Sequence, residues 1–321
     1  MKYNHISVML KEVIEYLQPK KGQVIVDCTL GGAGYTIEIA KQVGNGGKVI
    51  AIDADKVAIQ NAEQILKNKK IKNVILINDN FSNLQKIIQE NKLEKVDACV
   101  FDLGLSSYQL QDRSRGFSFG MDEALSMAFD GDDQEKTFHI VNKYSKQELQ
   151  RIIKEYGEEK FSGRITEAII KARPINSAKQ LAEVIYNTVP VSYQKGRIPS
   201  HTHSRGWAGK NPATRTFQAL RIETNQELVN LEKTLSQALN ILKPNGRLVV
   251  VSFHSLEDRI VKNIFRQEAS ECICDKERLI CDCEHQPSVK ILTKKPITPT
   301  AEEIKSNPRA RSAKLRAIEK I

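Results

Sequence analysis

A glycine-rich turn between two short apolar runs contains the residue types that could bind a nucleoside. The turn spans residues 28–34, and Asp53 ends the apolar run that follows it. Glycine lets a backbone approach a ligand closely, and a carboxylate at the end of the second run can accept hydrogen bonds from both ribose hydroxyls. The spacing therefore predicts a site for a cofactor that contains adenosine.

The spacing of the glycines narrows the choice of cofactor. A dinucleotide fingerprint reads Gly-x-Gly-x-x-Gly, but counting from Gly31 the second and third glycine positions hold Ala33 and Thr36. A phosphate-binding loop with Gly-Lys-Ser or Gly-Lys-Thr is also missing from the sequence. Asp27, just before the turn, suits a cofactor with a positive charge and no phosphate. S-adenosylmethionine has both properties.

The elements that must position these residues alternate between strand and helix. Apolar runs at 24–26, 49–52, 74–77 and 97–101 have strand character, and amphipathic stretches separate them. This alternation predicts an α/β fold with a parallel, doubly wound sheet, in which ligands bind beyond the carboxyl ends of the strands. The residues at or just beyond such ends are Asp27, Asp53, Phe81 and Asp102.

The middle of the chain interrupts this pattern. From about residue 109 to 213 the sequence predicts helices and irregular segments but no strong strand. A long helical stretch over 217–242, a turn at 243–246 and a fifth strand over 247–253 follow. We therefore expect a sheet domain in two parts, 1–108 and 214–321, interrupted by a helical insertion, 109–213.

The charge of the chain favours a polyanionic partner. The 321 residues carry a formal net charge of +10, and arginines gather around 197–221 and 309–316. Arginine is suited to bidentate phosphate contacts, so nucleic acid is the first expectation and a solvated lysine-rich surface is the alternative. No apolar run approaches the roughly 18 residues of a membrane span, and the first residues lack the apolar core of a secretory signal. We expect a cytoplasmic protein that does not bind membranes.

Four of the six cysteines lie within twelve positions near the C-terminal end. Four thiolates can hold zinc tetrahedrally, but these C-x-C pairs differ from the usual C-x2-C spacing. A structural zinc site and reduced thiols on a surface loop therefore both remain open. Cys28 and Cys99 are expected in the core of the sheet. The clustered residues are Cys272, Cys274, Cys281 and Cys283.

Five blocks of sequence, in one fixed order, resemble the MraW/RsmH family. The blocks span residues 102–107, 116–119, 212–221, 252–259 and 307–316. Members of that family use S-adenosylmethionine to methylate N4 of a cytosine in the decoding centre of 16S ribosomal RNA. The resemblance implies a class I (Rossmann-like) methyltransferase sheet with a helical, substrate-recognising insertion domain. It also implies the small ribosomal subunit and its 16S rRNA as partner, and leaves the oligomeric state open.

The resemblance also assigns a cofactor site. It implies that the turn backbone faces the methionine portion, that Asp53 binds the ribose and that Phe81 packs on the adenine. The family's Gly-Gly-His is Ala33-Gly34-Tyr35 in this chain, which requires Ala33 to adopt an unusual backbone angle. The cofactor positions are Ala33, Gly34, Tyr35, Asp53, Phe81, Asp102 and Gln109.

Catalytic and RNA-binding roles follow from the same resemblance. Asp102 is expected to position the target amine, with Ser106 and His254 as further candidates for this contact or for proton transfer. A structural hydrogen-bonding role is the alternative for His254. The arginines expected to contact phosphates are Arg215, Arg221, Arg309 and Arg311, and the alternative for each is an ion pair within the protein.

Two other functions are alternatives to this one. A DNA amino-methyltransferase would share the fold, but the sequence over 102–105 lacks the Pro-Pro-Tyr/Phe pattern of those enzymes. A non-catalytic RNA-binding assembly factor could retain the fold, although the acidic residues of the cofactor site are all present.

Overall fold

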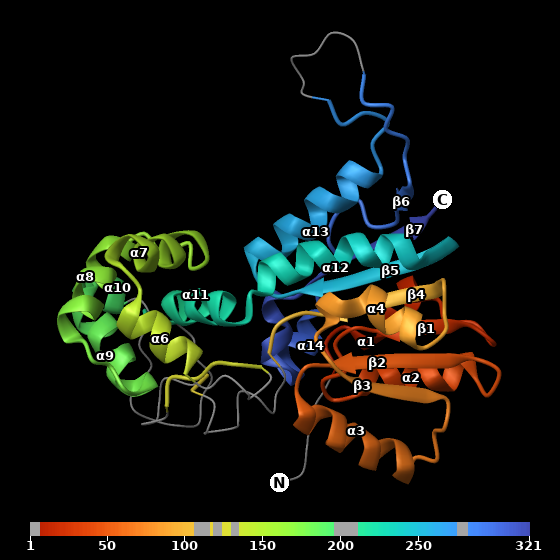
Figure 1. Ribbon diagram of the computed structural model, residues 1–321, viewed down its shortest axis with the longest axis horizontal. Coiled ribbons are helices and arrows are strands. Elements are labelled where there is room, and N and C mark those ends of the chain that lie inside the picture. Colours follow the sequence, from red (N-terminus) through yellow and green to blue (C-terminus); the bar gives the residue numbers. More distant parts are fainter. Residues whose placement is uncertain (1–6, 106–115, 118–123, 130–134, 196–210, 275–281) are drawn as a thin grey trace. The chain divides into compact units, whose positions relative to one another are not determined.

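The computed structural model describes residues 7–105, 116–117, 124–129, 135–195, 211–274 and 282–321 (Figure 1). The chain divides into two compact units, Met1–Ser106 with Leu228–Ile321, and Ser107–Glu227. Among the described residues no helix is long and apolar enough to cross a membrane.

The first unit is built on a seven-stranded sheet with the order β3-β2-β1-β4-β5-β7-β6 (Figure 1). Strands β1 to β5 run parallel, and β7 pairs antiparallel with both β5 and β6. The predicted doubly wound, Rossmann-like α/β sheet is therefore confirmed. The strands are β1 (Val24–Asp27), β2 (Lys48–Asp53), β3 (Val74–Asn78), β4 (Val96–Asp102), β5 (Leu242–Ser252), β6 (Val289–Ile291) and β7 (Lys314–Lys320).

Helices cover both faces of this sheet. Apolar residues of α4, α12 and α13 pack on one face, and those of α1, α2 and α3 pack on the other. Cys28 and Cys99 are buried in the first of these layers, as predicted. The helices of this unit are α1 (Leu10–Leu17), α2 (Gly34–Val43), α3 (Lys56–Asn68), η1 (Phe81–Asn83), α4 (Leu84–Glu90), α12 (Glu227–Ile241), α13 (Ser255–Glu268), α14 (Ala301–Ser306) and η2 (Pro308–Ser312).

Two predictions about the later part of the chain were wrong. The predicted turn at 243–246 lies within β5, where the pairing with β4 shifts register and Asn245 adopts a φ of 63°. The predicted helix over 217–242 is two helices, because Gln226 has a left-handed backbone with a φ of 50°. Strands β6 and β7 were not predicted, because basic residues interrupt the apolar residues of both segments.

The second unit is helical. Helix α8 packs against α7 and α9, and α11 packs against α6 and α7. Serines cap two of these helices: Ser145 forms a capping box with Glu148, and Ser177 accepts from the backbone of Gln180. The helices are α6 (Lys136–Lys143), α7 (Lys146–Glu155), α8 (Ser162–Ala172), α9 (Ala178–Thr188), α10 (Val191–Lys195) and α11 (Thr214–Asn225).

The domain limits 1–108, 109–213 and 214–321 stay a prediction. The compact helical unit extends to Glu227, beyond the expected limit at 213, because α11 packs on the helices of that unit.

Candidate active site

The turn after β1 is held between the two neighbouring strands. Cys28 donates its backbone N–H to Val100 of β4 at 2.9 Å, and Leu30 donates to Ile52 of β2 at 2.9 Å. Gly31 and Ala33 both have left-handed backbones, with φ values of 46° and 61°. The unusual angle expected at Ala33 is therefore present, and the turn crosses the carboxyl edge of the sheet.

Asp27 lies under this turn and is completely buried. Its carboxylate accepts hydrogen bonds from the Thr36 hydroxyl at 2.6 Å and the Thr29 backbone N–H at 3.2 Å. Burial nevertheless raises the pKa of Asp27 to about 6. A positive charge bound beside the turn would favour the ionised carboxylate.

Asp53, at the end of β2, holds the turn from the other side. Its two carboxylate oxygens accept backbone N–H groups from Gly31 and Asp55, each at 2.8 Å. Burial raises the pKa of Asp53 to about 6 as well. Each carboxylate oxygen has a second lone pair, so Asp53 can still accept hydrogen bonds from ribose hydroxyls.

Asp102 ends β4 and carries an unsatisfied acceptor. Its backbone N–H donates to the Thr29 hydroxyl at 2.6 Å, which ties β4 to the turn. Its Oδ1 atom is buried and has no hydrogen-bond partner among the residues that the structure describes. Burial, followed by the negative charges of Asp27 and Glu257, raises the pKa of Asp102 well above its usual range. Leaving such an acceptor unpaired costs roughly 1–3 kcal/mol, so this oxygen suits an N–H donor or a cation.

Phe81 lies in η1, just after β3. Its ring packs edge-on against Phe101, with centroids 5.9 Å apart, and the residue is half-buried. Asp79, which the sequence analysis missed, accepts hydrogen bonds from Asn80 (2.7 Å) and Asn83 (2.8 Å) and so fixes this turn. The sequence contains a signal for Asp79: an acidic residue directly follows β3, much as Asp53 ends β2.

The first residues of α2 complete the turn. The Tyr35 side chain is buried in the core, and its hydroxyl donates to the backbone carbonyl of Val8. Only the backbone of Tyr35 is therefore available to a ligand. A Cβ atom at Gly34 would lie 1.7 Å from the Ser7 hydroxyl oxygen, so a larger residue here would force the Ser7 side chain to move.

His254 caps helix α13. Its Nδ1 accepts the Glu257 backbone N–H at 3.4 Å, while the Glu257 carboxylate accepts the backbone N–H groups of Phe253 (2.8 Å) and His254 (3.2 Å). His254 Nε2 lies 3.1 Å from the other oxygen of Glu257. Through these contacts His254 has a structural hydrogen-bonding role at the start of α13. A catalytic role for His254 stays a prediction. Ser106 and Gln109 lie outside the described residues.

Asp258, in the first turn of α13, binds two basic residues of β7. Arg316 contacts the carboxylate at 2.6 Å and Lys314 at 3.2 Å. Desolvation opposes ionisation, but the hydrogen bonds to Arg316 and Lys314 prevail and lower the pKa of Asp258. Part of the basic C-terminal sequence therefore joins α13 to the sheet.

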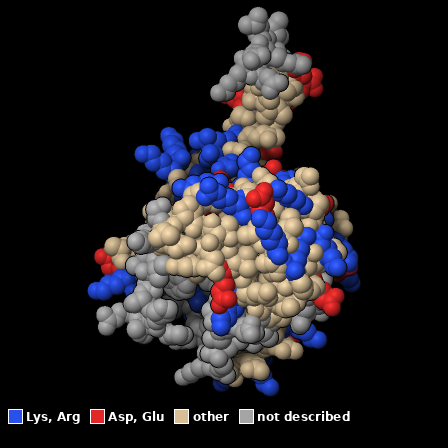
Figure 2. All heavy atoms as spheres, turned by 90° about the vertical axis from the view of Figure 1, so that its left-hand side faces the viewer, with Lys and Arg blue, Asp and Glu red and all other residues tan. Residues whose placement is uncertain are grey.

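The four arginines expected to contact RNA have different surroundings. Arg309 and Arg311 are exposed in η2. Arg215 is half-buried and donates to the backbone carbonyl of Glu158 at 2.8 Å. Arg221 makes two hydrogen bonds to the Glu227 carboxylate, at 2.7 and 2.9 Å, and its side chain is only 13% exposed. Figure 2 shows Lys and Arg side chains at many places on the face drawn, with fewer Asp and Glu side chains.

Comparisons with known proteins identify the family of the chain. A model of the MraW methylase family matches residues 2–321. A protein of Finegoldia magna named "Ribosomal RNA small subunit methyltransferase H" is 44% identical, with 100% of both chains covered. Proteins with the same name from Clostridium botulinum (strain Loch Maree / Type A3) and Clostridioides difficile (strain 630) are 44% and 43% identical, again over 100% of both chains. The chain therefore belongs to the MraW methylase family.

Proposed function

We propose that this protein transfers a methyl group from S-adenosylmethionine to N4 of a cytosine in the decoding centre of 16S rRNA. The observation that carries the proposal is the buried Oδ1 of Asp102 at the carboxyl end of β4, which has no hydrogen-bond partner in the described part of the chain. The full-length relatives named as methyltransferases of small-subunit RNA support the RNA substrate. The motifs shared with the family support the cytosine amine.

The residues around the turn fit this cofactor. Gly34 in the turn is half-buried and we assign the methionine portion to its backbone, Asp53 has free acceptor positions for the ribose, and the half-buried ring of Phe81 can pack on the adenine. The carboxylates of Asp27 and Asp102 supply negative charge to a positively charged cofactor. When bound, the cofactor supplies an electrophilic methyl group.

Asp102 then activates the amine. The lone pair of the cytosine N4 is delocalised into the ring, so the amine is a poor nucleophile. Asp102 Oδ1 accepts an N–H hydrogen bond from the amine, turns the lone pair toward the methyl group and accepts the amine proton. The raised pKa of Asp102 makes its carboxylate a stronger base for this step. Alignment of the amine with the methyl group contributes the remaining rate acceleration.

The RNA is held outside this pocket. The exposed guanidinium groups of Arg309 and Arg311 are placed to bind phosphates, with Arg215 as a further contact. Because Arg221 is bound by Glu227, an RNA contact from Arg221 would require this ion pair to open. We assign substrate recognition to the helical insertion and expect the protein in the cytoplasm, where ribosomal subunits are found. The target base must leave its stack to reach Asp102.

The test is methyl transfer from labelled S-adenosylmethionine to small ribosomal subunits that lack the modification. Nuclease digestion then identifies the labelled nucleoside, and we expect N4-methylated cytidine from the decoding centre. A label on another nucleoside would refute the cytosine assignment. Cofactor binding is measured on the same protein. If the protein neither binds the cofactor nor transfers a methyl group, the non-catalytic assembly factor is favoured. If it binds the cofactor but does not methylate the subunits, the assigned substrate is wrong.

A further inference from the structure

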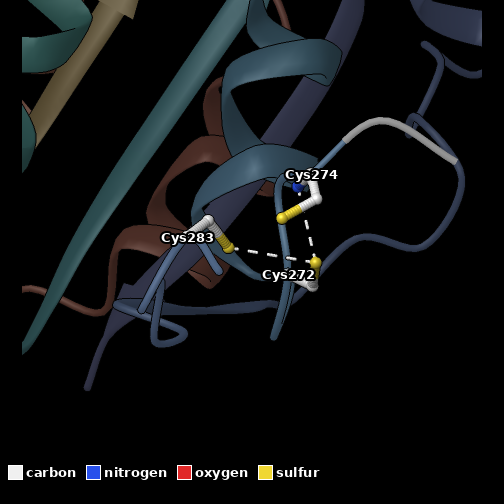
Figure 3. A group of neighbouring side chains, drawn as sticks. All are labelled: Cys272, Cys274 and Cys283. Carbon is white, nitrogen blue, oxygen red and sulfur yellow. Dashed lines mark hydrogen bonds between the residues drawn. The ribbon is translucent and has the colours of Figure 1, made fainter. Parts of the chain in front are cut away.

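Three cysteine sulfur atoms come together in the segment between α13 and β6. Figure 3 shows Cys272, Cys274 and Cys283 with their side chains turned toward one another. The three sulfur atoms all lie within 4.8 Å of one another, and Cys272 and Cys283 are 3.9 Å apart. Cys281, the fourth cysteine expected here, lies outside the described residues.

The distance between Cys272 and Cys283 matches two ligands of one metal ion. Zinc–sulfur bonds of about 2.3 Å at tetrahedral angles place two sulfurs roughly 3.8 Å apart. A disulfide would require a sulfur–sulfur distance of about 2.05 Å and would use only two of the three cysteines. Three converging sulfur atoms therefore favour a metal ion over a covalent pair.

Backbone hydrogen bonds fix the positions of two of the sulfur atoms. The N–H of Ile273 points to Cys283 Sγ and the N–H of Cys274 points to Cys272 Sγ, each at 3.4 Å. Contacts of this kind around a metal site orient its ligands.

The segment has a closed base but no core of its own. At its base, Ser288 donates its backbone N–H to Glu268 at 2.8 Å, and the His285 ring lies 3.0 Å from the carbonyl oxygen of Gln267. Among the described residues between 269 and 288, none is buried. Small segments without apolar packing commonly depend on a bound metal for a fixed conformation.

We propose that Cys272, Cys274 and Cys283 bind one zinc ion, which fixes the connection between α13 and β6. The ion replaces the three thiol protons, which pass to solvent, and a water or a further protein ligand fills its fourth position. Soft thiolate ligands select zinc over magnesium or calcium. The cluster follows the C-terminal end of α13, a helix about 20 Å long, whereas His254 and the methyltransferase pocket lie at its N-terminal end. The ion is therefore structural, and the proposal goes beyond the proposed function.

The experiment measures metal in the full-length protein. The chain is purified under reducing conditions without chelator, and zinc is quantified by elemental mass spectrometry. We expect about one zinc per chain in the wild type and the Glu284→Gln control, and at least tenfold less in a Cys272→Ser/Cys283→Ser variant. Cobalt substituted for zinc should give thiolate-to-cobalt charge-transfer bands in the wild type and not in the double variant.

Two results would overturn the zinc site. The first is a wild-type protein that binds no stoichiometric zinc or cobalt, and the second is a double variant that retains the metal. Intact mass provides a further check, because a metal-free protein lighter by two hydrogens would indicate a disulfide instead. S-adenosylmethionine binding, expected unchanged in all variants, verifies that each protein is folded and keeps this test independent of the proposed RNA substrate.

Discussion

Replacing Asp27 with asparagine should stabilise the cofactor-free protein at neutral pH. Asp27 is completely buried, and its pKa is raised from 3.8 to about 6. The folded protein therefore holds a proton on Asp27 that the unfolded chain releases between these two pH values. Stability associated with Asp27 is fully present below pH 3.8, falls as the pH rises toward 6, and stays low above it.

The size of the stability loss caused by Asp27 follows from the shift of its pKa. One pKa unit corresponds to about 1.36 kcal/mol, so a shift of roughly two units lowers the free energy of unfolding by about 3 kcal/mol at pH 7.5. The same relation gives a loss of only about 1 kcal/mol near pH 4.5. Asparagine is isosteric and uncharged: its carbonyl can accept the Thr29 N–H, and its amide can donate to the Thr36 hydroxyl. Both contacts can survive the substitution.

The assay is urea unfolding of the wild type and Asp27→Asn without cofactor, at about pH 4.5 and 7.5. We expect the stability difference between variant and wild type to grow by about 2 kcal/mol between these pH values. A difference that is independent of pH would refute the argument, because loss of packing or of a hydrogen bond alone does not titrate in this range. Added S-adenosylmethionine should stabilise the wild type more than the variant.

Three further predictions test other contacts. Asp102→Asn should lower the rate of methyl transfer by roughly 10²–10⁴-fold, measured as initial rates at saturating cofactor, and an unchanged rate would contradict its role as proton acceptor. The double variant Arg309→Ala/Arg311→Ala should bind RNA more weakly, and the slope of log affinity against log salt should fall by about 2, whereas Lys86→Ala on α4 should leave the slope unchanged. Asp258→Ala leaves Arg316 buried without its partner and should cost about 3–5 kcal/mol in denaturant unfolding. Lys314→Ala removes a more exposed partner of Asp258 and should cost far less.

The sequence predicts the first half of the fold well because burial there follows a simple pattern. Strands β1, β2 and β4 are largely buried and the edge strand β3 is half-buried, so all four are apolar runs that end in polar residues at the carboxyl edge. The glycine-rich turn and Asp53 could be placed for the same reason. Tyr35 could not, because nothing local indicates that its side chain turns into the core to reach Val8.

The C-terminal strand is hidden from sequence analysis by tertiary pairing. Strand β7 contains Lys314 and Arg316 among its apolar residues, which is typical of an exposed basic tail. Its basic side chains are held by Asp258, which is 58 positions away from Arg316 and on another element. A pairing over this separation cannot be found from local spacing, and for this reason two residues of the basic C-terminal sequence serve the fold.

The three acidic residues of the candidate site are costly to the cofactor-free protein, and this cost is consistent with the proposed ligand. Asp27 raises the pKa of both Asp53 and Asp102, so the carboxylates repel one another in a buried region. A protein selected for stability alone would not keep them, because an uncharged residue at any of the three positions would relieve the repulsion. A bound cofactor with a positive charge offsets this repulsion, because it favours the ionised form of the nearby carboxylates. Cofactor affinity should therefore fall as the pH drops below about 6, when Asp27 and Asp53 become protonated. Affinity that stays constant between pH 5 and 8 in isothermal titration would show that these acids do not contact the cofactor's charge.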